Sequence, residues 1–138
     1  MQSQPQVLVV TSDPDRSRVL SSLLVACGLE FVAKSSIREA SVFLAQSSVP
    51  LVFCENELPD GGFGDLLQAI SPARIPLVVA SRIADTRLYI EAMSRGAFDF
   101  IAPPFHRHEV ERIISNALRR PVTSVRSGEM VTASAAAR

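Results

Sequence analysis

The sequence has few cysteines, no excess of either charge and no long apolar run, and each shortage argues against a class of protein. Its only cysteines are Cys27 and Cys54, each flanked by apolar residues. They do not form the spacing of a metal site and suit buried thiols in a reducing compartment. The 14 basic and 14 acidic residues cancel, so no basic excess points to nucleic acid.

Membrane association is not expected either. The longest apolar runs are far shorter than the roughly 20 residues that a membrane span needs. Met1 to Gln6 lacks the positive and then apolar pattern of a signal peptide. The 138 residues are 47% hydrophobic with a mean hydropathy of +0.22, which is typical of one globular domain. We therefore expect a cytoplasmic protein with no nucleic-acid or membrane partner.

Short apolar runs alternate with helical patterns along residues 6–120. Val7–Val10 is apolar throughout and suits a strand that is covered on both faces. Asp13 and Pro14 are typical of a helix start, and Gly28 is typical of a helix end. The same reasoning predicts further strands at 31–33, 51–54, 75–80 and 98–102, and further helices at 36–46, 65–70, 85–95 and 109–120.

Five strands that alternate with five helices predict a parallel sheet with helices on both faces. Functional residues in such a fold lie where the strands end. Those ends are at 11–13, 55–57, 81–82 and 102–104. Any site is therefore expected at this edge of the sheet. Residues 121–138 show no clear period, which predicts a mobile tail or the start of a linker.

Four segments mark these loops, namely Val7–Val10, Leu58–Gly61, Ile75–Ser81 and Gly96–Phe105. By their order and spacing, residues 6–120 resemble the receiver domain of response regulators in bacterial two-component signalling. The resemblance implies a flavodoxin-like (βα)5 fold with strand order 2-1-3-4-5. It also implies a cis peptide bond before Pro104.

Receiver domains of this family accept a phosphoryl group on an Asp at the end of the third strand. Two acidic residues after the first strand hold Mg²⁺ with that Asp, and a Lys after the fifth strand balances the charge. By the resemblance, Glu55 stands at the acceptor position here. Thr11 and Ser12 stand at the acid-pair positions, and Pro103 stands at the Lys position.

Part of the family pattern is retained. Ser81 matches the hydroxyl residue that binds the phosphoryl oxygen, and Phe100 matches the aromatic residue that changes rotamer with it. A local hydrogen bond for Ser81 and a core position for Phe100 are the structural alternatives. Asp13 is the one carboxylate left in the first loop. Arg82 either pairs with Glu55 or Asp13 in place of the missing Lys, or is solvated.

These replacements predict a chemically inactive receiver. Mg²⁺ prefers carboxylate ligands, which the neutral hydroxyls of Thr11 and Ser12 do not replace. Phosphoryl transfer depends on positioning and on charge neutralisation by metal and cation. We expect weak or no Mg²⁺ binding, no other cofactor and no enzymatic activity. Glu55 is either a permanent mimic of the phosphorylated state or a solvated carboxylate.

The first functional hypothesis is an interaction module in a phosphorelay that acts without Asp phosphorylation. Its partner, another protein or a second copy of the chain, would bind the face formed by the fourth helix, fifth strand and fifth helix. The candidate residues are Arg87, Tyr89, Glu91, Arg95, Arg112 and Arg119. Two alternatives remain open. One is a phosphoreceiver that uses Asp13 or Asp60, and the other is a small-molecule or ion sensor at the altered strand ends.

Overall fold

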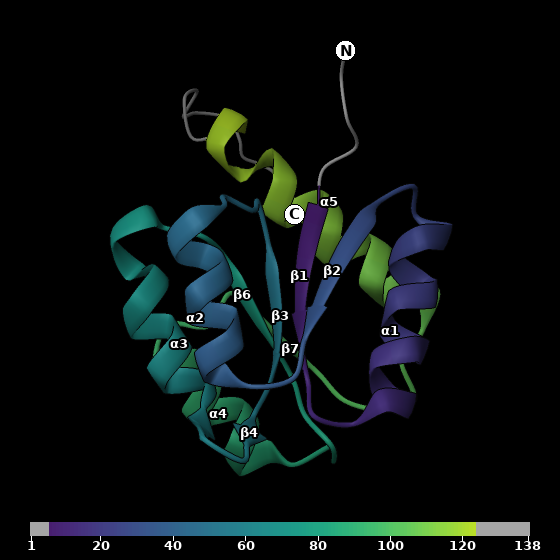
Figure 1. Cartoon of the computed structure of the whole chain (residues 1–138). Helices are drawn as coiled ribbons and strands as arrows, with labels where there is room; N and C mark the ends of the chain where they lie inside the picture. Colours follow the sequence, from purple (N-terminus) through teal and green to yellow (C-terminus); the bar gives the residue numbers. More distant parts are fainter. Residues whose placement is uncertain (1–5, 124–138) are drawn as a thin grey trace.

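The computed structural model of the chain describes residues 6–123, with side chains described up to Leu118. Strands and helices alternate along the chain (Figure 1). The elements are β1 (Gln6–Val10), α1 (Pro14–Ala26), β2 (Glu30–Lys34), α2 (Ile37–Gln46), β3 (Val52–Glu55), β4 (Glu57–Leu58), β5 (Gly61–Gly62), α3 (Phe63–Ile70), the 3-10 helix η1 (Ser71–Ala73), β6 (Leu77–Ala80), α4 (Thr86–Ser94), β7 (Asp99–Ile101) and α5 (Arg107–Thr123).

Five of the strands form one parallel sheet in the order β2-β1-β3-β6-β7. Because β4 and β5 pair only with each other, this is the predicted order 2-1-3-4-5. The last four residues of β1 and all of β3 and β6 are buried, as expected of apolar strands in the middle of a covered parallel sheet. The predicted fold class is thereby confirmed.

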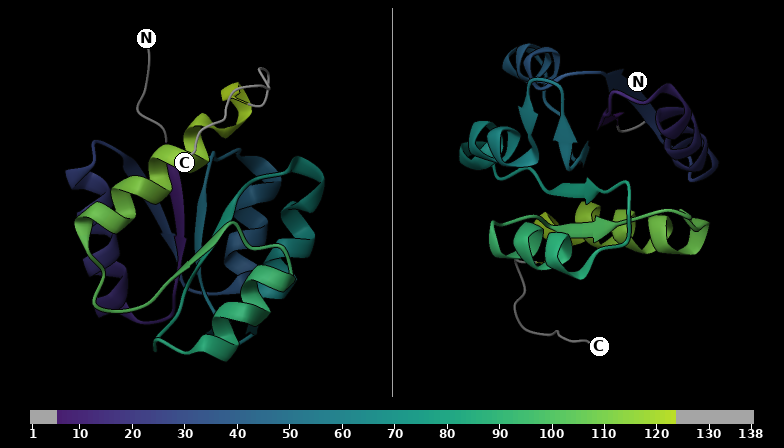
Figure 2. Two further views of the ribbon diagram at one scale, coloured as in Figure 1. Left: turned by 180° about the vertical axis from the view of Figure 1, so that it is seen from behind. Right: turned by 90° about the horizontal axis from the view of Figure 1, so that it is seen from below.

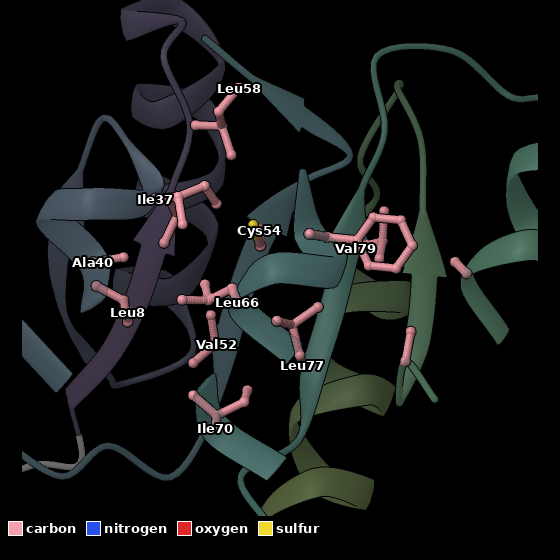
Figure 3. Close-up of a cluster of buried hydrophobic side chains, with 14 of the residues drawn as sticks. Leu8, Ile37, Ala40, Val52, Cys54, Leu58, Leu66, Ile70, Leu77 and Val79 are labelled. Atoms are coloured by element: carbon pink, nitrogen blue, oxygen red, sulfur yellow. The ribbon is translucent and has the colours of Figure 1, made fainter. Parts of the chain in front are cut away.

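Helices pack on both faces of the sheet (Figure 2). One core cluster joins the sheet to α2, α3 and α4, and a second joins it to α1 and α5. In the first cluster, strand residues and helix residues interdigitate (Figure 3); the labelled ones include Leu8, Val52, Leu77 and Val79 from the strands and Ile37, Ala40, Leu66 and Ile70 from the helices. Burial of these apolar side chains is the main source of stability for such a fold.

The helix starts follow from local sequence. The Asp13 side chain accepts hydrogen bonds from the backbone at the start of α1, where Pro14 occupies the first helical position. Ser36 caps α2 by accepting from the Glu39 amide at 3.0 Å. The Glu39 carboxylate accepts from the Ser35 amide rather than from the Ser36 amide, so the pair resembles a capping box that is shifted by one residue.

Besides shifts of one or two residues at most element ends, the structure departs from the predicted elements most clearly in two places. The antiparallel pair β4–β5 lies at residues 57–62, where no strand was predicted, and α3 begins at Phe63 rather than at residue 65. Helix α5 extends to Thr123, and the rest of the predicted tail, 124–138, lies outside the described residues. The peptide bond between Pro103 and Pro104 is cis, as predicted. No helix within residues 6–123 is long and apolar enough to cross a membrane.

Candidate functional site

Thr11, Glu55 and Ser81 lie at one edge of the sheet because the parallel strands β1, β3 and β6 end together there. The strand register pairs Val10 with Cys54 and Glu55 with Ala80. Thr11, which follows β1, therefore lies beside Glu55 at the end of β3. Ser81 follows β6 directly and donates its amide to the Ile101 carbonyl of β7 at 2.8 Å.

Glu55 is the central side chain of this edge, and only 1% of its surface is exposed. Its Oε1 atom accepts a hydrogen bond from the Thr11 hydroxyl at 2.9 Å and one from the Ser12 amide at 3.2 Å. A buried carboxylate is stable only when its oxygens are paired. Thr11 and Ser12, the residues expected at the acid-pair positions, thus bind an internal carboxylate, and Glu55 is not a solvated side chain.

The second oxygen of Glu55 contacts two guanidinium groups. Its Oε2 atom lies 3.1 Å from Nε of Arg82 and 3.3 Å from Nη1 of Arg16. The Arg16 side chain is 17% exposed and the Arg82 side chain is 61% exposed. Of the two expectations for Arg82, the structure shows the ion pair with Glu55. A single buried negative charge is therefore matched by two positive ones.

The contribution of Arg16 was not predicted from the sequence. This residue lies in the first turn of α1, and its Nη1 atom also lies 3.2 Å from Oδ2 of Asp13. The available signal was the spacing of three residues from Asp13, which places both side chains on the same side of a helix start. Because α1 begins at the strand-end edge, a side chain in its first turn reaches Glu55.

Asp13 has a structural role in addition to its ion pair. Its Oδ1 atom accepts from the Asp15 amide at 2.9 Å and from the Arg16 amide at 3.4 Å, which caps α1. The Asp13 amide donates to the Thr11 hydroxyl oxygen at 3.1 Å, and that hydroxyl donates to Glu55. The first loop therefore forms a continuous hydrogen-bonded chain that ends on the Glu55 carboxylate.

The residues at this edge do not fit the Mg²⁺ ion of receiver domains. Mg²⁺ requires near-octahedral oxygen ligands. The Arg16 guanidinium lies between the Asp13 and Glu55 carboxylates and would repel a divalent cation from that position. Within the described part of the chain, no group of three His, Cys, Asp or Glu side chains is arranged to hold a metal ion.

The two residues that match the receiver pattern lie as follows. Ser81 is fully buried, and its hydroxyl oxygen accepts from the Ile83 amide at 3.2 Å, so it supports the start of the loop that leads to α4. Phe100 is partly buried and meets Tyr89 edge to face, with ring centroids 5.7 Å apart and an interplanar angle of 87°. Pro103 is exposed and brings no charge to the site.

Two titratable groups near this edge have shifted pKa values. Burial, and secondarily the neighbouring Glu55 carboxylate, raises the pKa of the Cys54 thiol to about 12. Hydrogen bonds from the Ile37 and Arg38 amides, each 2.9 Å long, lower the pKa of Asp60. Asp60 thus binds the N-terminus of α2, and the interactions found for it do not involve Glu55.

Comparison with known proteins finds relatives among the response regulators. No family model matches the chain. Response regulator protein PilR from Pseudomonas aeruginosa is 28% identical over 119 residues, which cover 85% of this chain and 27% of PilR. Two-component response regulator EHD1 from Oryza sativa subsp. indica is 27% identical over 129 residues, which cover 91% of this chain and 38% of EHD1. The chain thus spans about a quarter to two fifths of the length of these relatives.

A solved response regulator receiver domain from Clostridium thermocellum superposes with a TM-score of 0.77 at 22% identity, over 87% of this chain and 98% of that one. Relatives are found both in a bacterium and in a plant, so the likeness does not restrict the chain to bacteria. The homologues and structural neighbours of this chain are response-regulator receiver domains, and its fold is the receiver fold.

Proposed function

We propose that the chain is a receiver module of two-component signalling that acts by binding a protein partner without phosphorylation of Glu55. The observation that supports this proposal is the buried Glu55 carboxylate, which is bound by Arg16 and Arg82. The strand-end site thus contains an internal anion, Glu55, and two internal cations, Arg16 and Arg82. In this proposal the chain is a signalling module and not an enzyme.

The same contacts connect the pocket to α4. Arg82 lies in the short segment between β6 and α4, and its ion pair fixes that segment against Glu55. Ser81 holds the next turn through the Ile83 amide. A phosphoryl group would carry a charge of about −1.5 to −2, compared with −1 for a carboxylate. In this proposal Glu55 permanently provides part of the negative charge that a phosphoryl group would add, without any phosphoryl transfer.

The partner surface in this proposal is the face formed by α4, β7 and α5. Three large apolar side chains, Ile83, Tyr89 and Ile90, are exposed on α4 and the segment before it. Tyr89 contacts Phe100 of β7, so this surface joins the element that follows Arg82 to the edge strand of the sheet. Exposed apolar side chains that lie close together mark interaction surfaces more often than chance.

The charged residues predicted for this face differ in their exposure and in their contacts. Arg87 and Glu91 are exposed, and Arg112 lies 3.7 Å from the Asp99 carboxylate of β7. Arg95 instead lies over the Phe63 ring of α3, 5.2 Å from its centroid, and pairs with Glu91. The side chain of Arg119 lies outside the described ones.

Among the contacts of the described residues, none favours the two alternative functions over this one. A phosphoreceiver based on Asp13 or Asp60 would need to release a carboxylate that already caps a helix. A sensor of small polar molecules would need to displace Glu55 from its four polar contacts.

Amide hydrogen exchange tests the proposed link between the pocket and the partner face. We expect Glu55→Gln to speed exchange in α4 and β7, because the loss of the carboxylate charge frees Arg82. Glu57→Gln, an exposed neighbour, is the matched control and should leave both elements unchanged. Acetyl phosphate with Mg²⁺ should not change exchange in the wild type. An unchanged α4 in Glu55→Gln, or a response of the wild type to acetyl phosphate, would contradict the proposal.

A further inference from the structure

Strand β2 forms an edge of the sheet and is more exposed than the strands at its centre (Figure 1). Glu30, Phe31 and Ala33 are exposed, and Val32 and Lys34 are partly buried against the α2 side, where Lys34 lies 5.5 Å from the centroid of the Phe43 ring. An edge strand offers unpaired backbone groups to another strand.

The backbone of β2 determines which groups face outward. The Lys34 carbonyl accepts from the Thr11 amide at 3.1 Å, so Lys34 directs its backbone groups toward β1. In a parallel pair, alternate residues of a strand face the same neighbour. Glu30 and Val32 therefore also face β1, and the amides and carbonyls of Phe31 and Ala33 point away from the sheet.

The sequence of β2 is complementary to itself in the antiparallel direction. Glu-Phe-Val-Ala-Lys, read against its own reverse, pairs Val32 with Val32, Phe31 with Ala33, and Glu30 with Lys34. In this register, Phe31 and Ala33 would form the hydrogen-bonded pairs, and these are the residues whose backbone groups point away from the sheet. The two opposite-charge pairs would lie at the two ends of the ribbon.

We propose that β2 is a self-association surface, through which two copies of this chain join edge to edge around Val32. The two sheets would then form one continuous sheet about a two-fold axis that is perpendicular to it. The occupant of the edge is a second copy because both the charge pattern and the positions of the free backbone groups match this register. This proposal does not depend on the proposed function of the Glu55 site.

A groove beside β2 is consistent with this arrangement. It has a volume of about 530 Å³ and is formed by α1 and Phe31, with small or apolar residues on most of its wall, namely Pro14, Ser17, Ser21, Ser22 and Val25, and with Arg18. Val25 is 57% exposed. A two-fold axis perpendicular to the sheet places both α1 helices on the same side, so each groove would face the other copy. Small side chains allow two helices to approach closely.

Charge reversal tests the register directly, with the dissociation constant measured by analytical ultracentrifugation of the whole chain. Lys34→Glu should weaken the dimer about tenfold or more, because it sets Glu30 against Glu at both ends. Glu30→Lys should weaken it similarly. The double variant Glu30→Lys/Lys34→Glu should restore the wild-type value. It loses the Lys34–Phe43 contact just as Lys34→Glu does, so its recovery would show that the charge pairing and not this contact sets the affinity.

Ala33→Pro provides a second test, because it removes an outward amide while leaving the residues that pair with β1 intact. We expect it to abolish dimers, with the far-ultraviolet circular dichroism of a folded monomer. Tyr89→Ser, on the α4 face, is the control and should leave this dimer unchanged. A chain that stays monomeric throughout the micromolar range overturns the proposal. So does a dimer that Ala33→Pro leaves intact, or a double variant that fails to restore association.

Discussion

One nitrogen of Arg16 binds both the Glu55 and the Asp13 carboxylates at the edge where the strands of the sheet end. Nη1 of Arg16 lies 3.3 Å from Oε2 of Glu55, and the same atom lies 3.2 Å from Oδ2 of Asp13. A cation that bridges two carboxylates stabilises both negative charges. Because Arg16 is part of the chain, this stabilisation requires neither Mg²⁺ nor a phosphoryl donor.

The two arginines should contribute very differently to stability. Arg16→Ala leaves a buried carboxylate with one exposed cation, and we expect a loss of about 3 kcal/mol in the free energy of unfolding, at the low end for breaking a buried pair. Arg82→Ala removes a largely exposed side chain, and we expect a loss of about 0–1 kcal/mol. Urea unfolding of the two variants gives the comparison. An equal loss in both would show that Arg16 is not the main partner of Glu55.

The Glu55 carboxylate should be replaceable by a free anion. Glu55→Ala leaves the Arg16 and Arg82 guanidinium groups, the Thr11 hydroxyl and the Ser12 amide around a vacated space. We expect formate or acetate to raise the melting temperature of this variant in a saturable way, as any ligand of the folded state does. The wild type and the Arg16→Ala/Glu55→Ala variant should respond only to ionic strength. An identical response of all three proteins would rule out an anion site.

The two thiols should differ in reactivity. The pKa of Cys54 is raised to about 12 by burial and by Glu55, so its thiol stays protonated at ordinary pH. Cys27 also has a raised pKa, chiefly from burial, but it is only partly buried. At pH 8 we expect iodoacetamide to modify Cys27 first, with intact mass reaching a plateau at one adduct. Simultaneous modification of both thiols would show that the end of β3 opens readily.

Acid should remove the contribution of Asp60. Its pKa is lowered in the folded chain by the Ile37 and Arg38 amides, so the stabilisation is present above the ordinary value near 3.8. It is lost as the pH falls below that value and through the lowered one. We expect Asp60→Asn to reduce the melting temperature at neutral pH and to flatten its decline in acid. A decline as steep as that of the wild type would assign the acid sensitivity to other groups.

The sequence was sufficient to predict the architecture but not the full charge network. Apolar strands such as Val7–Val10 and the Asp13-Pro14 helix start are local signals, and they gave the strand order through the resemblance. The pairing of Glu55 with Arg82 was one of two open readings, because side-chain directions depend on the packed sheet. Arg16 was missed since its role arises only when the first turn of α1 is placed against β3.

The short β4–β5 pair shows a second reason why some features could not be predicted. Glycine and proline in the 58–64 segment indicate a turn, but the shape of that turn depends on a distant contact. The Asp60 carboxylate binds the α2 N-terminus, and the Gly62 amide donates to the Asp65 carboxylate at 3.1 Å. The Asp60 interactions join residues that are 22 and 23 positions apart in the sequence, so local propensity does not reveal them.

The most direct measurement is the intact mass of the wild-type chain after incubation with acetyl phosphate and Mg²⁺. We predict an unmodified mass for the wild type and for Glu55→Asp. By the resemblance, Thr11, Ser12, Glu55 and Pro103 stand where a receiver has its acid pair, acceptor Asp and Lys, and Arg16 lies between the Asp13 and Glu55 carboxylates. A receiver domain with the complete set of acidic residues and lysine serves as the positive control. A stoichiometric phosphoryl adduct on the wild-type chain would contradict the account.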